Sequence, residues 1–167
     1  KRSVTFERNG ISIGVVGLTT DGLGTLASPE SMAELALAPF FESAQQEVDR
    51  LRNDVDVVVA LTHSGLDADR RLAAAVDGID LIVGGHSHSA LERAETLGAT
   101  TIVQAGSHGR QMGLVRLRVS DHGLRSASYQ LVDLDPVSLP GSPSPEVTAL
   151  VDTWGTRVDD DYRTTLG

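Results

Sequence analysis

Apolar runs and amphipathic stretches alternate along the first two thirds of the chain. Short uninterrupted apolar runs predict buried strands over residues 11–18, 55–61, 81–84 and 101–105. Apolar residues at helical spacing predict one helix over about residues 39–53 and a shorter, alanine-rich helix over residues 67–76. The second helix lies between two predicted strands, an order that is typical of a βαβ unit with parallel strands. The pattern therefore predicts an α/β fold.

Two further patterns predict β-hairpins. Asn9-Gly10 joins two strand-like stretches, and this dipeptide favours a type I′ turn. Alternating apolar and polar residues over 114–119 and 124–134 surround Asp121-His122-Gly123, which predicts a second hairpin with His122 in a solvated turn. The polar, glycine-rich residues 19–29 predict a plain connecting loop.

The end of the chain has a different character. Residues 135–146 contain four prolines and predict a stiff linker. Beyond it, apolar residues at helical spacing predict one face of a helix over residues 147–163: Val147, Leu150, Val151, Trp154 and Val158. Because little chain remains for this face to pack against, we expect the helix to dock on a neighbouring copy, in self-association, or to be mobile.

Composition narrows the range of functions. The 167 residues are 40% hydrophobic and 22% charged, which is ordinary for one soluble globular domain. The net charge of −9 excludes a nucleic-acid polymer or an anionic membrane as the main partner. It does not exclude a phosphate substrate, because bound divalent ions reverse the local charge. Without cysteine, any metal must be held by nitrogen and oxygen ligands, and no apolar run approaches the ~20 residues that cross a bilayer.

Three histidines follow two of the predicted strands. His63 follows the strand over 55–61, whereas His86 and His88 follow Leu81–Val83 and two glycines. If the backbone stays extended there, the last two side chains lie on one face about 7 Å apart. Imidazoles at that spacing can hold one ion between them, or one ion each of a pair about 4 Å apart. A single histidine at a strand end is more often structural, but three at one rim favour a metal site.

The segments that carry these histidines also carry a family resemblance. The elements LTHSG, GGHSH and QAGSHGR, in this order and spacing, resemble the calcineurin-like metallophosphoesterases, in particular the 5′-nucleotidase and 2′,3′-cyclic-nucleotide phosphodiesterase branch. The similarity covers about residues 10–134. It implies that His63 and His86 bind one divalent ion and His88 another, with two ions (zinc, manganese or similar) in the complete enzyme. By the same comparison, His108 is a loop residue near the site and not a ligand, and Arg110 meets a substrate anion or forms a structural salt bridge.

The motifs D-x-H, G-D and G-N-H-E, which this family supplies from an earlier half of the domain, do not occur in the sequence. The first residue is Lys1 and not Met, so we expect a piece of a longer protein. The resemblance then implies the C-terminal half of a calcineurin-like four-layer α-β-β-α sandwich over 1–134, a linker over 135–146, and over 147–167 a linker helix towards an absent nucleotidase C-terminal domain.

Together, these observations predict that the chain is part of a two-metal phosphoesterase that hydrolyses phosphate esters, nucleotides in particular. The chain would supply three metal ligands and no catalytic acid or base, and would be inactive without the N-terminal half of the catalytic domain as its partner. No substrate-binding residue is identified. Two alternatives stay open: a non-catalytic metal-binding fragment or remnant, and a related thiosulfohydrolase. The resemblance also implies an extracytoplasmic location (periplasmic, secreted or on the cell surface), which the sequence itself does not show.

Overall fold

A computed structural model describes residues 2–20, 22–33, 35–120, 123–135, 141 and 143–163. The chain forms two compact units, Lys1–Leu134 and Asp135–Gly167, and each is described by itself. The expected turn residue His122 lies outside the described residues, as does much of the expected linker.

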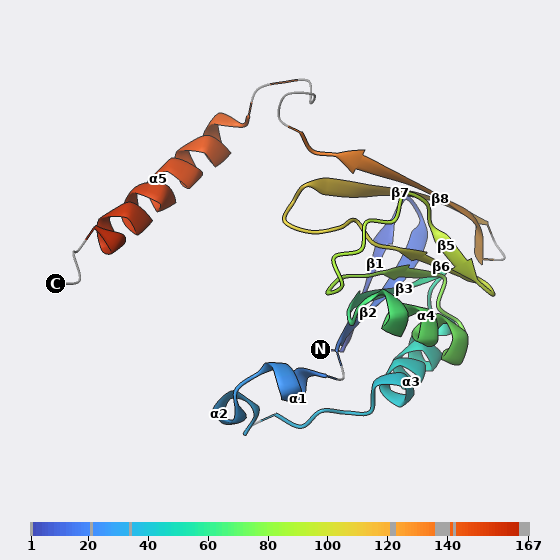
Figure 1. The fold of residues 1–167 in the computed structure, drawn as a ribbon. Coiled ribbons are helices and arrows are strands. Elements are labelled where there is room, and N and C mark those ends of the chain that lie inside the picture. Colours follow the sequence, from blue (N-terminus) through green and yellow to red (C-terminus); the bar gives the residue numbers. More distant parts are fainter. Residues whose placement is uncertain are drawn as a thin grey trace. The chain divides into compact units, whose positions relative to one another are not determined.

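The first unit is built around a six-stranded sheet (Figure 1). Its strands are β1 (Ser3–Arg8), β2 (Ile11–Thr19), β3 (Val57–His63), β4 (Leu81–Val83), β5 (Glu95–Leu97) and β6 (Thr100–Val103), in the order β1-β2-β3-β4-β6-β5. Strands β2, β3, β4 and β6 are parallel, and the two edge strands pair antiparallel to their neighbours. All four predicted strands lie in this sheet, so the α/β prediction is confirmed.

Two helices cover one face of the sheet, α3 (Phe40–Arg52) and α4 (Leu66–Ala75). Helix α3 buries Ala44, Val48 and Leu51, a spacing that places all three on one side of the helix. Its acidic residue in the first turn and its two arginines in the last turn suit the helix dipole. The buried side chains of both helices meet those of β3 and its neighbours and form the core.

The opposite face of the sheet is apolar but only partly covered. In β3, residues 58, 60 and 62 are buried, whereas Leu61 is 54% exposed and His63 is exposed. On the edge strand, Val4 and Phe6 are each 50% exposed. Because side chains alternate across a strand, these exposed residues lie on the side away from the helices.

A separate antiparallel hairpin of β7 (Gln111–Ser120) and β8 (Gly123–Asp133) lies on the side of the sheet opposite the helices (Figure 1). The Tyr129 hydroxyl donates to the backbone oxygen of Gln104 at 3.2 Å, which ties the hairpin to the end of β6. Burial raises the pKa of this tyrosine. The second predicted hairpin is confirmed by the antiparallel pairing of β7 and β8, which reaches Ser120 and Gly123.

The prediction of a plain loop over 19–29 is wrong. Two short helices, α1 (Leu23–Leu26) and α2 (Pro29–Met32), lie in this region. The second begins at a proline, and the Ser28 side chain caps it by accepting from the backbone N–H of Ser31 at 3.2 Å. Helices of four residues are shorter than the window over which hydrophobic periodicity can be recognised, which explains the error.

The second unit contains one helix, α5 (Pro145–Tyr162). Within it no residue is buried, and Trp154 is 56% exposed with the guanidinium of Arg157 5.0 Å from its ring centroid. The expected docking or mobility of this helix stays a prediction. In the described part of the chain, none of the helices is both long enough and apolar enough to span a bilayer.

Candidate functional site

Three loops place four imidazoles at the carboxyl ends of the parallel strands. His63 is the last residue of β3, and His86 follows β4 after Gly84-Gly85. The ring centroids of these two histidines are 5.1 Å apart, with the ring planes at 71°. The loop after β6 brings His108 to His88, at 5.3 Å and 68°. The rim therefore carries two pairs of imidazoles.

The glycine that precedes His86 allows the first pair to form. A Cβ at Gly85 would lie 3.1 Å from Nδ1 of His63 and 3.3 Å from the backbone oxygen of Thr62. Both distances are tighter than ordinary van der Waals contact, so any larger residue here would push the β4 loop away from the end of β3. The close approach of the two loops depends on the absence of a side chain at this position.

The expectation of an extended backbone between His86 and His88 is wrong. His86 has φ = 76° and His88 has φ = 57°, both in the left-handed region, and His108 has φ = 59°. The turns therefore direct the two side chains to different partners, His86 to His63 and His88 to His108. The only other non-glycine residue with positive φ in the described ranges is Asn9, in a hairpin turn. Such conformations cost about 1–3 kcal/mol each and cluster at functional sites, where the surrounding structure holds them.

The donor chemistry fits a divalent metal in part. Neutral imidazoles bind zinc and similar ions at about 2.0–2.1 Å, and the separation of His63 and His86 allows both to reach one ion. Over the ranges that the structure describes, no group of three or more His, Asp or Glu side chains is arranged to hold a metal ion. The described chain thus offers pairs of imidazoles, and a complete coordination shell requires further donors.

A buried carboxylate supports the end of β3. Asp69 on α4 is fully buried, and its Oδ1 accepts from the hydroxyls of Thr62 at 2.7 Å and Ser64 at 2.8 Å, the two residues that flank His63. Burial raises the pKa of Asp69, although both hydrogen bonds act in the opposite direction. Sequence reasoning missed this residue, because an acidic residue early in a helix is also common on a solvated surface.

A buried amide supports the loop after β4 in the same way. Gln104 is 2% exposed, and its Oε1 accepts from the backbone N–H of Ser89 at 2.9 Å and from the hydroxyl of Ser87 at 2.8 Å. The Ser87 oxygen in turn accepts from the backbone N–H of Leu66 at 3.1 Å. The loop with the left-handed histidines is therefore tied to both β6 and α4. The QAGSHGR element carries part of the family resemblance in the sequence, but the supporting role of its glutamine was missed.

Arg110 lies in the loop that carries His108. It is exposed, and in the part of the chain that the structure describes it takes part in no ion pair. Of the two roles expected from sequence, a structural salt bridge finds no support there, whereas a contact with a substrate anion stays a prediction.

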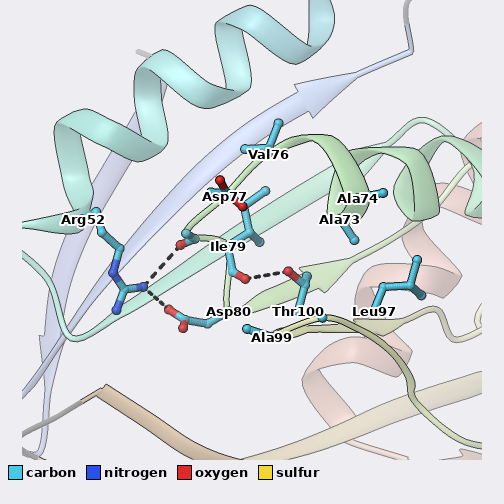
Figure 2. A pocket seen from close by; sticks show the side chains of 12 residues that line it. Arg52, Ala73, Ala74, Val76, Asp77, Ile79, Asp80, Leu97, Ala99 and Thr100 are labelled. Carbon is cyan, nitrogen blue, oxygen red and sulfur yellow. Dashed lines mark hydrogen bonds and ion pairs between the residues drawn. The ribbon is translucent and has the colours of Figure 1, made fainter.

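A cavity of about 490 Å³ lies at the amino ends of β4 and β6, opposite the strand ends that carry the histidines (Figure 2). Its polar groups already pair with one another. Arg52 forms an ion pair with Asp80 and donates to the Gly78 backbone oxygen at 3.3 Å, and the Thr100 hydroxyl donates to the backbone oxygen of Ile79 at 2.8 Å. These groups hold the strand ends together, so the cavity is not a candidate for the chemistry of the histidine rim.

Comparison with known proteins agrees with the resemblance noted in the sequence. The chain is 28% identical over 162 residues to the trifunctional nucleotide phosphoesterase protein YfkN of Bacillus subtilis, covering 94% of this chain and 11% of that protein. It is 43% identical over 93 residues to an apyrase of Tabanus yao, covering 54% of this chain and 16% of the apyrase. No family model matches the chain.

Solved structures show the same likeness at the level of the fold. The sulfate thiohydrolase SoxB of Thermus thermophilus superposes with a TM-score of 0.83 at 27% identity, over 95% of this chain and 29% of that one. The chain thus spans between about a tenth and a third of the length of these relatives. The homologues are hydrolases.

Proposed function

Because the homologues of this chain are 5′-nucleotidases and calcineurin-like phosphoesterases, we propose that it is the C-terminal half of a two-metal phosphoesterase domain that hydrolyses nucleotides or related phosphate esters. In this proposal His63 and His86 bind one divalent ion and His88 binds the second. His108 is a neighbour of His88 and not a ligand. A partner half supplies the remaining ligands and the general acid.

The observation that carries the proposal is the pairing of the His63 and His86 rings at 5.1 Å on a rim where they can share an ion. When bound, divalent ions polarise the phosphoryl group and activate a water. The contribution of this chain is to hold its imidazoles in place. Thr62 and Ser64, bonded to Asp69, fix the strand end on both sides of His63. Gln104 fixes the loop on both sides of His88.

The partly covered face of the sheet supports the proposal of a partner half. Val4, Phe6 and Leu61 are each about half-exposed on one apolar face, and His63 ends the β3 row on the same face. A segment packed there would bury this face and would also reach the imidazoles. The lack of a third ligand among the described residues fits the same arrangement. An extracytoplasmic location belongs to this proposal as well.

The thiohydrolase alternative rests on a specific observation, the TM-score of 0.83 with SoxB. The two reactions attack different atoms of their substrates, and the residues of this rim fit either reaction. The other alternative, a metal-binding fragment without catalysis, predicts zinc binding but no activity under any condition.

A reconstitution assay distinguishes the proposed function from its two alternatives. The chain alone, with Mn²⁺ or Zn²⁺, should hydrolyse 5′-AMP, a 2′,3′-cyclic nucleotide and an aryl phosphate at least about 100-fold more slowly than the chain expressed together with its upstream half, because acid catalysis alone is worth 10²–10⁴-fold. A thiosulfonate-type substrate is assayed in parallel. Full activity of the chain alone would contradict the division of the site between two halves. If neither form is active, the result would favour the non-catalytic metal-binding fragment.

Replacing Leu61 by serine tests the open face. We expect the stability of the isolated chain to change by less than about 0.5 kcal/mol, because exposed positions tolerate substitution. Association with the upstream half should weaken about 10-fold or more, since burying a leucine contributes about 1.5–3 kcal/mol. Urea unfolding and a binding titration measure the two effects. Leu26→Ser, at another exposed leucine on α1, is the matched control and should alter neither; equal affinity of the Leu61 variant would exclude this face as the interface.

A further inference from the structure

The two buried supports of the histidine rim each have one polar atom without a partner. Oδ2 of Asp69 and Nε2 of Gln104 are the buried side-chain atoms in the described residues that make no hydrogen bond. Buried groups of this kind are rare, and a carboxylate oxygen without a donor is costly. Each of these atoms therefore calls for an explanation.

The two unpaired atoms lie near the same glycine, Gly84. A Cβ at Gly84 would overlap Oδ2 of Asp69, and it would lie 3.5 Å from Nε2 of Gln104. Both atoms are thus close to one point beside the β4 backbone, where only a glycine leaves room. Gly84 is also held in place, because its N–H donates to the backbone oxygen of Val103 at 2.8 Å.

The two atoms are chemically complementary. Oδ2 of a carboxylate accepts hydrogen bonds. The orientation of the Gln104 amide follows from its partners, since the atom that faces the backbone N–H of Ser89 must be the oxygen. Nε2, a donor, is therefore the atom of this amide that is left without a partner. Because both unpaired atoms lie near the same point beside Gly84, a hydrogen bond between them would satisfy the donor and the acceptor together.

We propose that Asp69 and Gln104 form one brace beneath the rim, joined across Gly84 by a hydrogen bond from Nε2 to Oδ2. The brace links the support of His63 to the support of the His86–Ser89 loop, and so sets the distance between ligands that come from two different strands. Both are positioning residues, since neither touches the reacting atoms. The role assigned to the histidines rests on the proposed function, whereas the brace itself does not.

Exchanging the two groups tests the brace. In Asp69→Asn, Oδ1 can still accept from Thr62 and Ser64, but a donor now faces the donor of Gln104. In Gln104→Glu, one oxygen keeps Ser87 and Ser89, but an acceptor now faces the acceptor of Asp69. The double variant restores a donor and an acceptor with the polarity reversed, at nearly the same volume and the same total charge. Only a direct link between the two side chains predicts that the second substitution repairs the first.

Two readouts are needed on the full 167-residue chain. Without metal, each single variant should lower the unfolding temperature by several degrees and shift the ¹H–¹⁵N signals of the His63 and His86 rings, and the double variant should recover most of both changes. With Zn²⁺, each single variant should weaken binding about 10-fold, as loss of groups that orient metal ligands does, and the double variant should return to within about twofold of the wild type.

The exposed pair of Gln45 and Asp49, bonded at 2.8 Å on α3, provides the matched control. Gln45→Glu and Asp49→Asn make the same chemical changes on the surface, and should leave zinc affinity and the histidine signals unchanged. Additive losses in the Asp69 and Gln104 double variant, without recovery, would overturn the brace. If the wild-type chain binds no zinc, the proposed function fails, and the metal-free measurements still decide whether the brace exists.

Discussion

Replacing His86 by alanine should reduce phosphate-ester hydrolysis by the reconstituted enzyme about 1,000-fold or more. His86 is paired with His63, so its loss leaves the proposed shared ion with one ligand from this chain. Stabilisation of the transition-state charge by a metal is worth several kcal/mol, and each 1.36 kcal/mol is tenfold in rate. Initial rates with 5′-AMP and the metal content of the purified variant measure the effect. His63→Ala should behave in the same way.

The other histidines provide graded controls. His108→Ala should lower the rate less than about tenfold, because the proposal makes it a neighbour of His88 and not a ligand. His122→Ala should have no effect, since the sequence predicts a turn residue there. A His86→Ala enzyme that keeps its activity and its metal would show that the ligands lie elsewhere.

Replacing Gly84 by alanine should destabilise the chain by about 2–3 kcal/mol, the upper range for overpacking in a core. The new methyl group would overlap Oδ2 of Asp69, and this carboxylate cannot turn away without breaking its bonds to Thr62 and Ser64. The backbone cannot yield easily either, because the strand continues on one side and the histidine loop begins on the other. The free energy of unfolding in urea is the measurement.

Gly17→Ala is the matched control for this substitution. Gly17 lies in strand β2 of the main sheet, and a Cβ there would meet nothing within 4 Å. Its replacement should therefore change stability by less than about 0.5 kcal/mol, or increase it slightly, because alanine loses less conformational freedom on folding. Equal effects at the two glycines would mean that the contact between Asp69 and the β4 backbone does not constrain the fold.

The strands of the main sheet, and the histidines at their ends, could be predicted from the apolar pattern alone. Apolar runs such as residues 55–61 can be recognised in the sequence because the strands of a parallel sheet are apolar on both faces, and the βαβ order leaves few topologies. From there it follows that residues after parallel strands share one rim. The short elements α1 and β5 could not be predicted, because four and three residues are too few to show a hydrophobic periodicity.

How the histidine rings face one another depends on contacts between separate segments of the folded chain. Left-handed turns at His86 and His88 are unfavourable for the local sequence, and they persist because Gln104, which lies outside the loop, accepts hydrogen bonds from Ser87 and Ser89 within it. The same holds for Asp69, a helix residue that becomes a buried support only when α4 packs on β3. Periodicity reports which side of an element is apolar. Which polar groups meet inside depends on distances between segments far apart in the chain, and no local pattern encodes them.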